Sequence, residues 1–208
     1  MTELIQETAD DIQYLESISN ALDIALNEAD LAQIKEELMQ SGYIRRKHTK
    51  KKVKLTSKPM HYISSDGYDM YVGKNNLQNE ELTFSFANGN DWWFHTKGAP
   101  GSHVIVKSGG DELPDRTFEE AGRLAAYYSK NRGADKVEID YIQKKHVKKP
   151  NGAKPGFVVY YTNYSLVIDS DISNIKMCRI NFCTFFTIHY ILSGSGQIID
   201  KLLGSSSR

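Results

Sequence analysis

The spacing of apolar residues changes at Pro59, and this change divides the chain into a helical segment and a strand-rich domain. Before Pro59, the positions that follow a three-and-four spacing are Ile5, Thr8, Ile12, Leu15, Ser19, Leu22, Leu26 and Ala29. This spacing is typical of a coiled-coil seam, here weakened by Thr8 and Ser19. After Pro59, apolar and polar residues alternate, as in β-strands. The two patterns predict a coiled-coil helical segment at 1–42 and an α+β domain at 59–175.

The helical segment is expected to contain two helices at the end of a longer arm. The first spans about residues 3–28, and the second begins at Asp30, with Gln33 as its capping-box partner, and ends near Gly42. Because the seam starts abruptly, its partner helix is expected outside this chain, and the chain is expected to be a fragment of a longer protein. A basic linker at 43–58 follows, and we expect the helices to project from the α+β domain.

Strands and helices are interspersed in the second part of the chain. Strands are expected at 61–63 and 68–72, on both sides of a turn at 98–101, at 137–141 and within 156–167. Two helices are expected: one at 117–133, and one at 76–86, where a third strand is the alternative and the helix is favoured. The helix at 117–133 would begin with a capping box of Thr117 and Glu120, and its apolar face contains Phe118, Ala121, Leu124, Ala125 and Tyr128. Together these elements predict a mixed or antiparallel sheet with a few helices.

Residues 176–208 are apolar and then rich in glycine and serine. Two interpretations stay open: a last strand with a tail, or an atypical tail that does not belong to the native domain. The spacing of Cys178 and Cys183 favours neither a zinc site nor a disulfide framework, so we expect no metal, no disulfide and no cofactor. The longest apolar run, 182–192, is too short to span a bilayer. No signal peptide opens the chain, so a cytoplasmic location without a membrane partner is expected.

Charge is distributed unevenly, although the formal net charge is zero. Residues 1–38 contain ten acidic residues and one basic residue, whereas residues 39–65 contain no acid. The first basic cluster contains Arg45, Arg46, Lys47, Lys50, Lys51, Lys52, Lys54 and Lys58. The second contains Lys144, Lys145, Lys148, Lys149 and Lys154. Concentrated positive charge attracts phosphate backbones and releases their counterions. The clusters therefore indicate RNA contact, with solvated loops as the alternative.

The stretch DWWFHTKGAPGSHVIV, residues 91–106, combines aromatic residues with a glycine-proline turn. It is typical of a strand, a tight connection and a second strand. On such a strand, Trp92 and Phe94 would point to one face, and Trp93 and His95 to the other. The aromatic side chains are then either packing in the core or a surface on which unpaired RNA bases stack.

The same stretch offers residue types that are used in catalysis. Asp91, His95, Ser102 and His103 allow a hydrolase interpretation, in which the two histidines would act as acid and base. A metal site with these histidines lacks a supporting motif, and the sequence contains neither a P-loop nor a GxGxxG motif. We therefore expect a binding module rather than an enzyme.

Two stretches, DWWFHTKGAPGSHVIV and KKPNGAKPGFVVYY, together resemble the signature of the NFACT-R domain. The matching residues are Asp91, Trp93, Phe94, His95, Pro100, Gly101, Ser102, His103, Lys149, Pro150, Gly152, Ala153, Lys154, Pro155 and Gly156. The resemblance covers about residues 1–172, because family members carry a coiled-coil arm just before this domain. It does not extend beyond Ile175.

The resemblance implies an RNA-binding module of a ribosome quality control factor. Full-length family members engage stalled large ribosomal subunits that carry peptidyl-tRNA, and in bacteria they direct addition of alanine to the stalled chain. The implied partners are the large ribosomal subunit, rRNA and tRNA. The family's N-terminal module for tRNA selection is not recognised here, so this chain alone is not expected to support tailing. Some members are labelled fibronectin-binding, which gives an adhesin-like module as the alternative, and the helical seam would allow self-association.

Nucleic-acid contact is assigned to basic residues of both clusters and to residues of the aromatic motif. The assigned residues are Arg45, Arg46, Lys47, Lys50, Lys51, Lys52, Trp93, His95, Lys97, Ser102, His103, Lys144, Lys145, Lys148, Lys149 and Lys154. In this interpretation the basic residues neutralise phosphates, while the motif hairpin shapes the contact surface.

Overall fold

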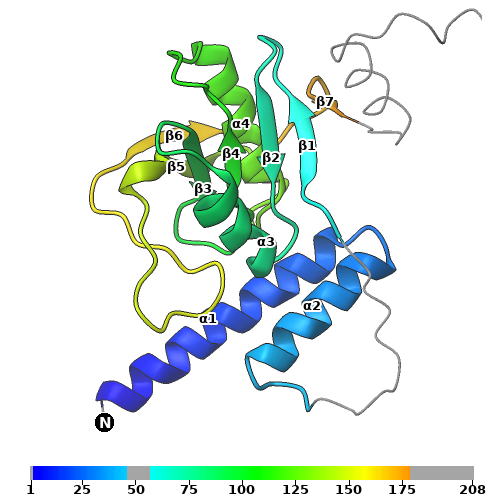
Figure 1. Cartoon of the computed structure of the whole chain (residues 1–208), viewed down its shortest axis with the longest axis vertical. Coiled ribbons are helices and arrows are strands. Elements are labelled where there is room, and N and C mark those ends of the chain that lie inside the picture. Colours follow the sequence, from blue (N-terminus) through cyan, green and yellow to red (C-terminus); the bar gives the residue numbers. More distant parts are fainter. Residues whose placement is uncertain (1, 46–56, 179–208) are drawn as a thin grey trace, which may run out of the picture. The chain divides into compact units, whose positions relative to one another are not determined.

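The computed structural model describes residues 2–45 and 57–178, and in this part of the chain seven strands form one sheet (Figure 1). The strand order is β6-β5-β3-β4-β2-β1-β7, and all neighbouring strands run antiparallel. The strands are β1 (Met60–Ile63), β2 (Asp69–Val72), β3 (Trp92–Thr96), β4 (Val104–Val106), β5 (Val137–Gln143), β6 (Tyr164–Ile168) and β7 (Lys176–Met177).

Helices flank this sheet, which confirms the predicted α+β class. The described helices are α1 (Thr2–Ile24), α2 (Glu28–Gln40), α3 (Asn76–Glu81), the π-helix η1 (Leu82–Phe86), α4 (Asp115–Tyr127) and the 3-10 helix η2 (Lys144–His146). One face of the sheet is covered by α4 and the other by α3 and η1, while α1 and α2 lie side by side next to α3 (Figure 1). None of the helices in the described ranges is long and apolar enough to cross a membrane.

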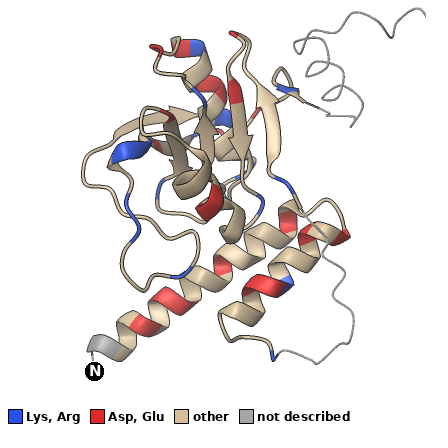
Figure 2. Ribbon diagram, viewed as in Figure 1, with Lys and Arg blue, Asp and Glu red and all other residues tan. Residues whose placement is uncertain are grey.

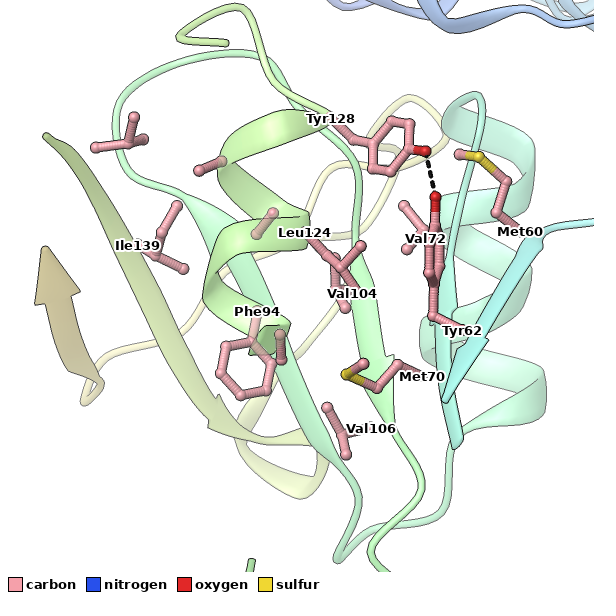
Figure 3. Close-up of a cluster of buried hydrophobic side chains, with 14 of the residues drawn as sticks. Met60, Tyr62, Met70, Val72, Phe94, Val104, Val106, Leu124, Tyr128 and Ile139 are labelled. Atoms are coloured by element: carbon pink, nitrogen blue, oxygen red, sulfur yellow. Dashed lines mark hydrogen bonds between the residues drawn. The ribbon is translucent and has the colours of Figure 1, made fainter. Parts of the chain in front are cut away.

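The main core lies between α4 and the sheet (Figure 3). Phe94 of β3 and Ile139 of β5 pack in the same cluster as Leu124 of α4, and all three side chains are fully buried. Burial of a side chain of this size stabilises a fold by about 1.5–3 kcal/mol. The hydroxyls of Tyr62 and Tyr128 share a hydrogen bond of 2.6 Å, which satisfies two buried polar groups. The predicted apolar face of the helix is therefore confirmed.

The start of α2 differs from the prediction because Asn27 caps it. Asn27 Oδ1 accepts hydrogen bonds from the backbone N–H groups of Ala29 at 2.9 Å and Asp30 at 3.1 Å. Accordingly, α1 ends at Ile24, before the predicted end of the first helix. The predicted capping box of Asp30 and Gln33 is wrong, since the Asp30 carboxylate instead binds residues of the sheet domain.

The predicted capping box at the start of α4 is also wrong. The residue that precedes α4 is Pro114, and the Thr117 hydroxyl donates to Asp66 Oδ2 at 2.8 Å. The Glu120 carboxylate accepts from the backbone N–H and the hydroxyl of Ser65, at 2.7 and 2.5 Å. Both side chains thus hydrogen-bond to the β1–β2 turn and hold it against the helix. A pattern typical of a helix cap serves a tertiary contact, because the turn lies beside the first turns of α4.

The end of the domain is less regular than predicted. Strand pairing begins at Tyr164, whereas residues 156–163 contain a single bridge, between Val159 and Lys148. The predicted strand region at 156–167 is therefore confirmed only in its last residues. β7 pairs with β1, as expected for a last strand. Cys178 is a free thiol. Cys183 lies outside the described ranges, so the absence of a disulfide between the two cysteines stays a prediction.

α1 buries a different face from the predicted seam. Tyr14, Ile18 and Ala21 are buried and pack with Ile34 of α2. The large apolar residues of the predicted seam are exposed; they are Ile5, Ile12, Leu15, Leu22 and Leu26. The helix therefore has two apolar faces, of which α2 covers one. Self-association through the exposed face stays a prediction.

The two helices pack against the sheet domain and do not project from it, contrary to the prediction. Lys74, in the β2–α3 connection, forms an ion pair with Asp30 of α2, and both side chains are almost fully buried. Asn76 of α3 donates from Nδ2 to Glu37 Oε1 of α2 at 2.8 Å. These buried polar contacts join the helices to the domain, and the described residues up to Met177 form one compact unit.

Candidate functional site

β3 distributes the aromatic residues of the motif between the two faces of the sheet. Trp92 packs edge-on against Phe118 of α4, with ring centroids 4.8 Å apart. Trp93 points to the opposite face, where it is fully buried and its ring stacks on His95 at a centroid distance of 5.7 Å. The predicted alternation along the strand is confirmed. Because Trp93 is fully buried, its ring does not form an open stacking platform on the sheet.

Glycines let two loops approach their neighbours closely on the Trp93 face. A Cβ atom at Gly101 would lie 2.8 Å from Thr96 Cγ2, so a larger residue would push the turn away from β3. Gly156 has a φ of +81°, and a Cβ there would lie 2.9 Å from Asn76 Cβ of α3. The turn after β3 and the loop before β6 therefore help enclose one cavity.

This cavity has a volume of about 250 Å³ and is bounded by four parts of the chain. They are the C-terminal half of β3 with the turn that follows, α1, α3 and the loop before β6. Side chains that line it include Trp93, His95, Thr96, His103, Asn79 and Tyr160. The cavity thus gathers both histidines of the motif and one of its three aromatic residues, Trp93.

Both motif histidines line the cavity, and both are neutral at pH 7. Burial lowers the pKa of His95 to about 4. Burial, and then the neighbouring His95 ring, lower the pKa of His103 well below its usual value. His103 Nδ1 lies 2.8 Å from the Thr83 hydroxyl oxygen, and the His103 backbone N–H donates to Asn79 Oδ1 at 3.0 Å. These rings therefore supply hydrogen-bonding edges and flat surfaces, not positive charge.

We expect the protein to lose stability as the pH falls from about 6.5 toward about 4. A histidine in the unfolded chain has a pKa of about 6.5, above the pKa of His95 in the fold, so acid favours the unfolded state. Thermal melting at about pH 7 and about pH 5 measures this loss. His95→Gln should reduce it, whereas His146→Gln, at an exposed histidine, should not. An equal loss in His95→Gln and the parent protein would contradict the assignment.

Of the residues of the hydrolase interpretation, His95 and His103 lie together, with ring centroids 5.4 Å apart, whereas Asp91 is engaged elsewhere. The Asp91 carboxylate accepts hydrogen bonds from Lys107 Nζ at 2.5 Å and from the Asn88 backbone N–H at 2.7 Å. It precedes His95 by four residues, which corresponds to about 13 Å along a strand. Ser102 is buried. Among the residues that the structure describes, no group of three or more His, Cys, Asp or Glu side chains could hold a metal ion.

The second basic cluster lies along η2 and the loop that follows it (Figure 2). Lys149 pairs with Glu80 at 2.6 Å, and Lys154 pairs with Asp11 of α1. The cluster residues without an ion pair to another described residue are Lys144, Lys145 and Lys148. Their charges are therefore not neutralised by the described part of the chain, whereas those of Lys149 and Lys154 are partly compensated.

The other predicted RNA contacts are placed only in part. Lys97 is exposed and pairs with Glu138 at 2.5 Å, and Arg45 is exposed after α2. The remaining assigned residues of the first cluster lie outside the described ranges; they are Arg46, Lys47, Lys50, Lys51 and Lys52. Their role stays a prediction from the sequence.

Comparison with known proteins assigns both parts of the chain. Residues 58–162 match the NFACT protein RNA binding domain, and residues 1–57 match the NFACT N-terminal and middle domains. The chain belongs to the NFACT family. This confirms the resemblance drawn from the two NFACT-R motifs.

Relatives of this NFACT chain include proteins named Rqc2 homolog RqcH. The one from Streptococcus pneumoniae serotype 2 is 44% identical over 180 residues, covering 86% of this chain and 32% of the relative. The one from Bacillus subtilis is 40% identical over 174 residues, covering 81% of this chain and 30% of the relative. The NFACT chain thus spans about a third of the length of these relatives.

A solved structure shares the same fold. It is the C-terminal part of the fibronectin/fibrinogen-binding protein from Streptococcus suis, with a TM-score of 0.77 and 42% sequence identity. The similarity covers 83% of this NFACT chain and 68% of that chain. The fold of the matched part of the chain therefore resembles that of a solved relative.

Sequence reasoning missed the polar residues that two helices bring to the NFACT cavity. Asn76 and Asn79 are three positions apart on α3, and Gln13 and Ser17 are four positions apart on α1. Residues at these spacings lie on one face of a helix. The spacing was the available signal, but it did not reveal that the two faces meet beside Trp93.

Proposed function

We propose that this chain is the RNA-binding part of a ribosome quality control factor. The match of residues 58–162 to the NFACT RNA-binding domain carries the proposal, and the RqcH relatives support it. The full-length protein would engage stalled large ribosomal subunits that carry peptidyl-tRNA, and it would support addition of an alanine tail. Its partners would then be rRNA and tRNA, and it would act in the cytoplasm, where ribosomes translate.

The charge distribution supports contact with RNA on the side of η2. Figure 2 shows acidic residues along α1 and α2 and basic residues along the segment 144–154. A phosphate backbone is repelled by the first surface and attracted by the second. Lys144, Lys145 and Lys148 would neutralise phosphates, since they have no ion pair within the described residues.

Replacing Lys144, Lys145 and Lys148 together with alanine is expected to weaken RNA binding and to reduce its salt dependence. If all three contact phosphates, the slope of log affinity against log salt should fall by about 2 to 3, because each phosphate contact releases about 0.7–0.9 counterions. The measurement is a salt titration of binding to a single-stranded RNA, with circular dichroism to verify the fold.

A matched control removes the same charge from another part of the surface. Lys35, Lys136 and Lys176 are exposed, and their joint replacement with alanine should leave the slope nearly unchanged. Equal slopes for both triple variants would contradict the assignment of phosphate contacts to η2. The role of the whole protein is tested by co-sedimentation of the full-length parent with dissociated large ribosomal subunits. Absence from the subunit fraction would contradict that role.

Fibronectin binding is a second candidate function, favoured by the name of the structural relative from Streptococcus suis, a fibronectin/fibrinogen-binding protein. Under this alternative the surface of the domain would bind a host protein instead of RNA. Binding of the chain to immobilised fibronectin, together with surface labelling of intact cells, distinguishes the two. If the chain is retained on immobilised fibronectin and does not bind RNA, the fibronectin-binding function is favoured.

A further inference from the structure

Tyr161 is the most exposed of the large apolar side chains that the structure describes. It lies in the segment before β6 and is 85% exposed. Within the described ranges, its ring contacts no other ring and its hydroxyl has no hydrogen-bond partner. Both faces of this ring are therefore accessible to a binding partner.

Two hydrogen bonds fix the segment of Tyr161 against the second basic cluster. The Lys148 backbone N–H donates to the Val159 carbonyl at 2.9 Å, and the Val159 N–H donates to the Lys148 carbonyl at 2.8 Å. Figure 1 shows the chain before β6 returning alongside the chain that follows η2. Residues paired in this antiparallel way carry their side chains on the same side, about 4.5–5.5 Å apart. Lys148 and Val159 thus share one face of a short ribbon.

Alternation along the ribbon places Tyr161 on that same face. Val158 and Tyr160 pack inward, into an apolar cluster on the sheet. Val159 and Tyr161 are instead 37% and 85% exposed, and Lys148 is exposed as well. In extended chain, residues two apart point to the same side and lie about 7 Å from each other. The outer face of the ribbon therefore presents an aromatic ring, an aliphatic side chain and a cation together.

The charge next to this ring is positive and not compensated. Lys144, Lys145 and Lys148 have no ion pair with another described residue, and they lie along η2 and the residues directly after it. An open neutral ring beside such cations matches the two parts of a nucleotide, which are a flat base and a charged phosphate. Proteins that bind single strands combine a basic track with aromatic rings for this reason.

We infer that Tyr161 stacks on one unpaired base of the bound RNA, while Lys148 and its neighbours neutralise the adjoining phosphates. This inference rests on the proposed RNA-binding function and adds a base contact to it. A base within a duplex is already stacked on both faces, so the ring would select single-stranded positions. The contact is indifferent to base identity, because every base has a flat face.

The test measures binding of the complete 208-residue chain to a single-stranded RNA, to the same strand with abasic nucleotides throughout, and to a duplex. Tyr161→Ala should weaken binding of the normal single strand about 5- to 150-fold, the range for loss of one stacked base. The salt slope should not change, because the substitution removes no charge. Binding of the abasic strand and of the duplex should be unchanged. Tyr161→Phe keeps the ring and should bind all three as the parent chain does.

Tyr164→Ala is the matched control. Tyr164 is 62% exposed, but its ring stacks on Tyr141 on the α4 side of the sheet, with centroids 5.5 Å apart. Its removal should leave the affinity for single-stranded RNA unchanged. Circular dichroism verifies that each variant is folded.

The possible outcomes separate the base contact from the RNA-binding function. Parent-like affinity of Tyr161→Ala for the normal single strand, with a normal salt slope, would overturn the base contact and leave RNA binding standing. An equal loss on normal and abasic strands would overturn it too, and so would an equal loss in Tyr161→Phe or in Tyr164→Ala. Absence of binding of the parent chain to all three RNAs would overturn both the contact and the function.

Discussion

Replacing Lys74 with methionine is expected to lower the free energy of unfolding by about 3–5 kcal/mol, because it leaves a buried carboxylate without its counter-charge. The side chains of Lys74 and Asp30 are only 6% and 1% exposed. Burial raises the pKa of Asp30, but hydrogen bonds from Lys74, from Ser57 and from the Leu26 backbone outweigh it and lower the pKa below 3.8. Asp30 is therefore charged at neutral pH, and its charge needs Lys74. Urea unfolding followed by circular dichroism measures the change.

An exposed ion pair provides the matched control. Lys97 and Glu138 are 50% and 47% exposed, so Lys97→Met should cost less than about 1 kcal/mol. Combining Lys74→Met with Asp30→Leu should recover part of the loss, since the double variant leaves no buried charge. A loss in Lys74→Met as small as that in Lys97→Met would contradict the role of this pair in joining α2 to the sheet domain.

Replacing Trp93 with alanine is expected to destabilise the fold by about 3–5 kcal/mol, because it removes a large, fully buried side chain. Trp93 lies opposite Ile105 of β4 and Ile142 of β5 in the central part of the sheet, and it packs with both in one apolar cluster. Neither neighbouring strand can move in without breaking its own pairing. Thermal melting and urea unfolding at neutral pH would measure the loss.

Trp92→Ala is the informative comparison for this variant. Trp92 is adjacent in sequence but only partly buried, and it contacts Phe118 and Tyr141 on the α4 side. Its removal should cost less than the removal of Trp93. Equal losses would show that the Trp93 ring contributes no more to the core than its neighbour does. Trp93, which lines the cavity, could then be displaced with little loss of folding free energy.

Periodic patterns in the sequence determined the elements and the family. The apolar face of α4 and the alternation along β3 were predicted correctly, because each depends on the local geometry of a helix or a strand. The two NFACT-R motifs identified the family, since their residue types and spacing are specific. The two faces of the motif strand also followed from its alternation, but which face would border a cavity did not.

Tertiary structure decided which partner each polar side chain takes and which face of α1 is buried. Asp30 and Glu120 both match helix-capping patterns, yet each binds a residue far away in the sequence. A carboxylate accepts from any nearby donor, so its partner depends on which segments the fold brings together. In the same way, α1 has two apolar faces, and α2 packs on the face with Tyr14 and Ile18. Spacing in the sequence cannot choose between two faces that would both gain from burial, because the gain depends on what lies opposite. The cavity has the same origin, since it exists only where α1, α3 and two loops meet beside β3.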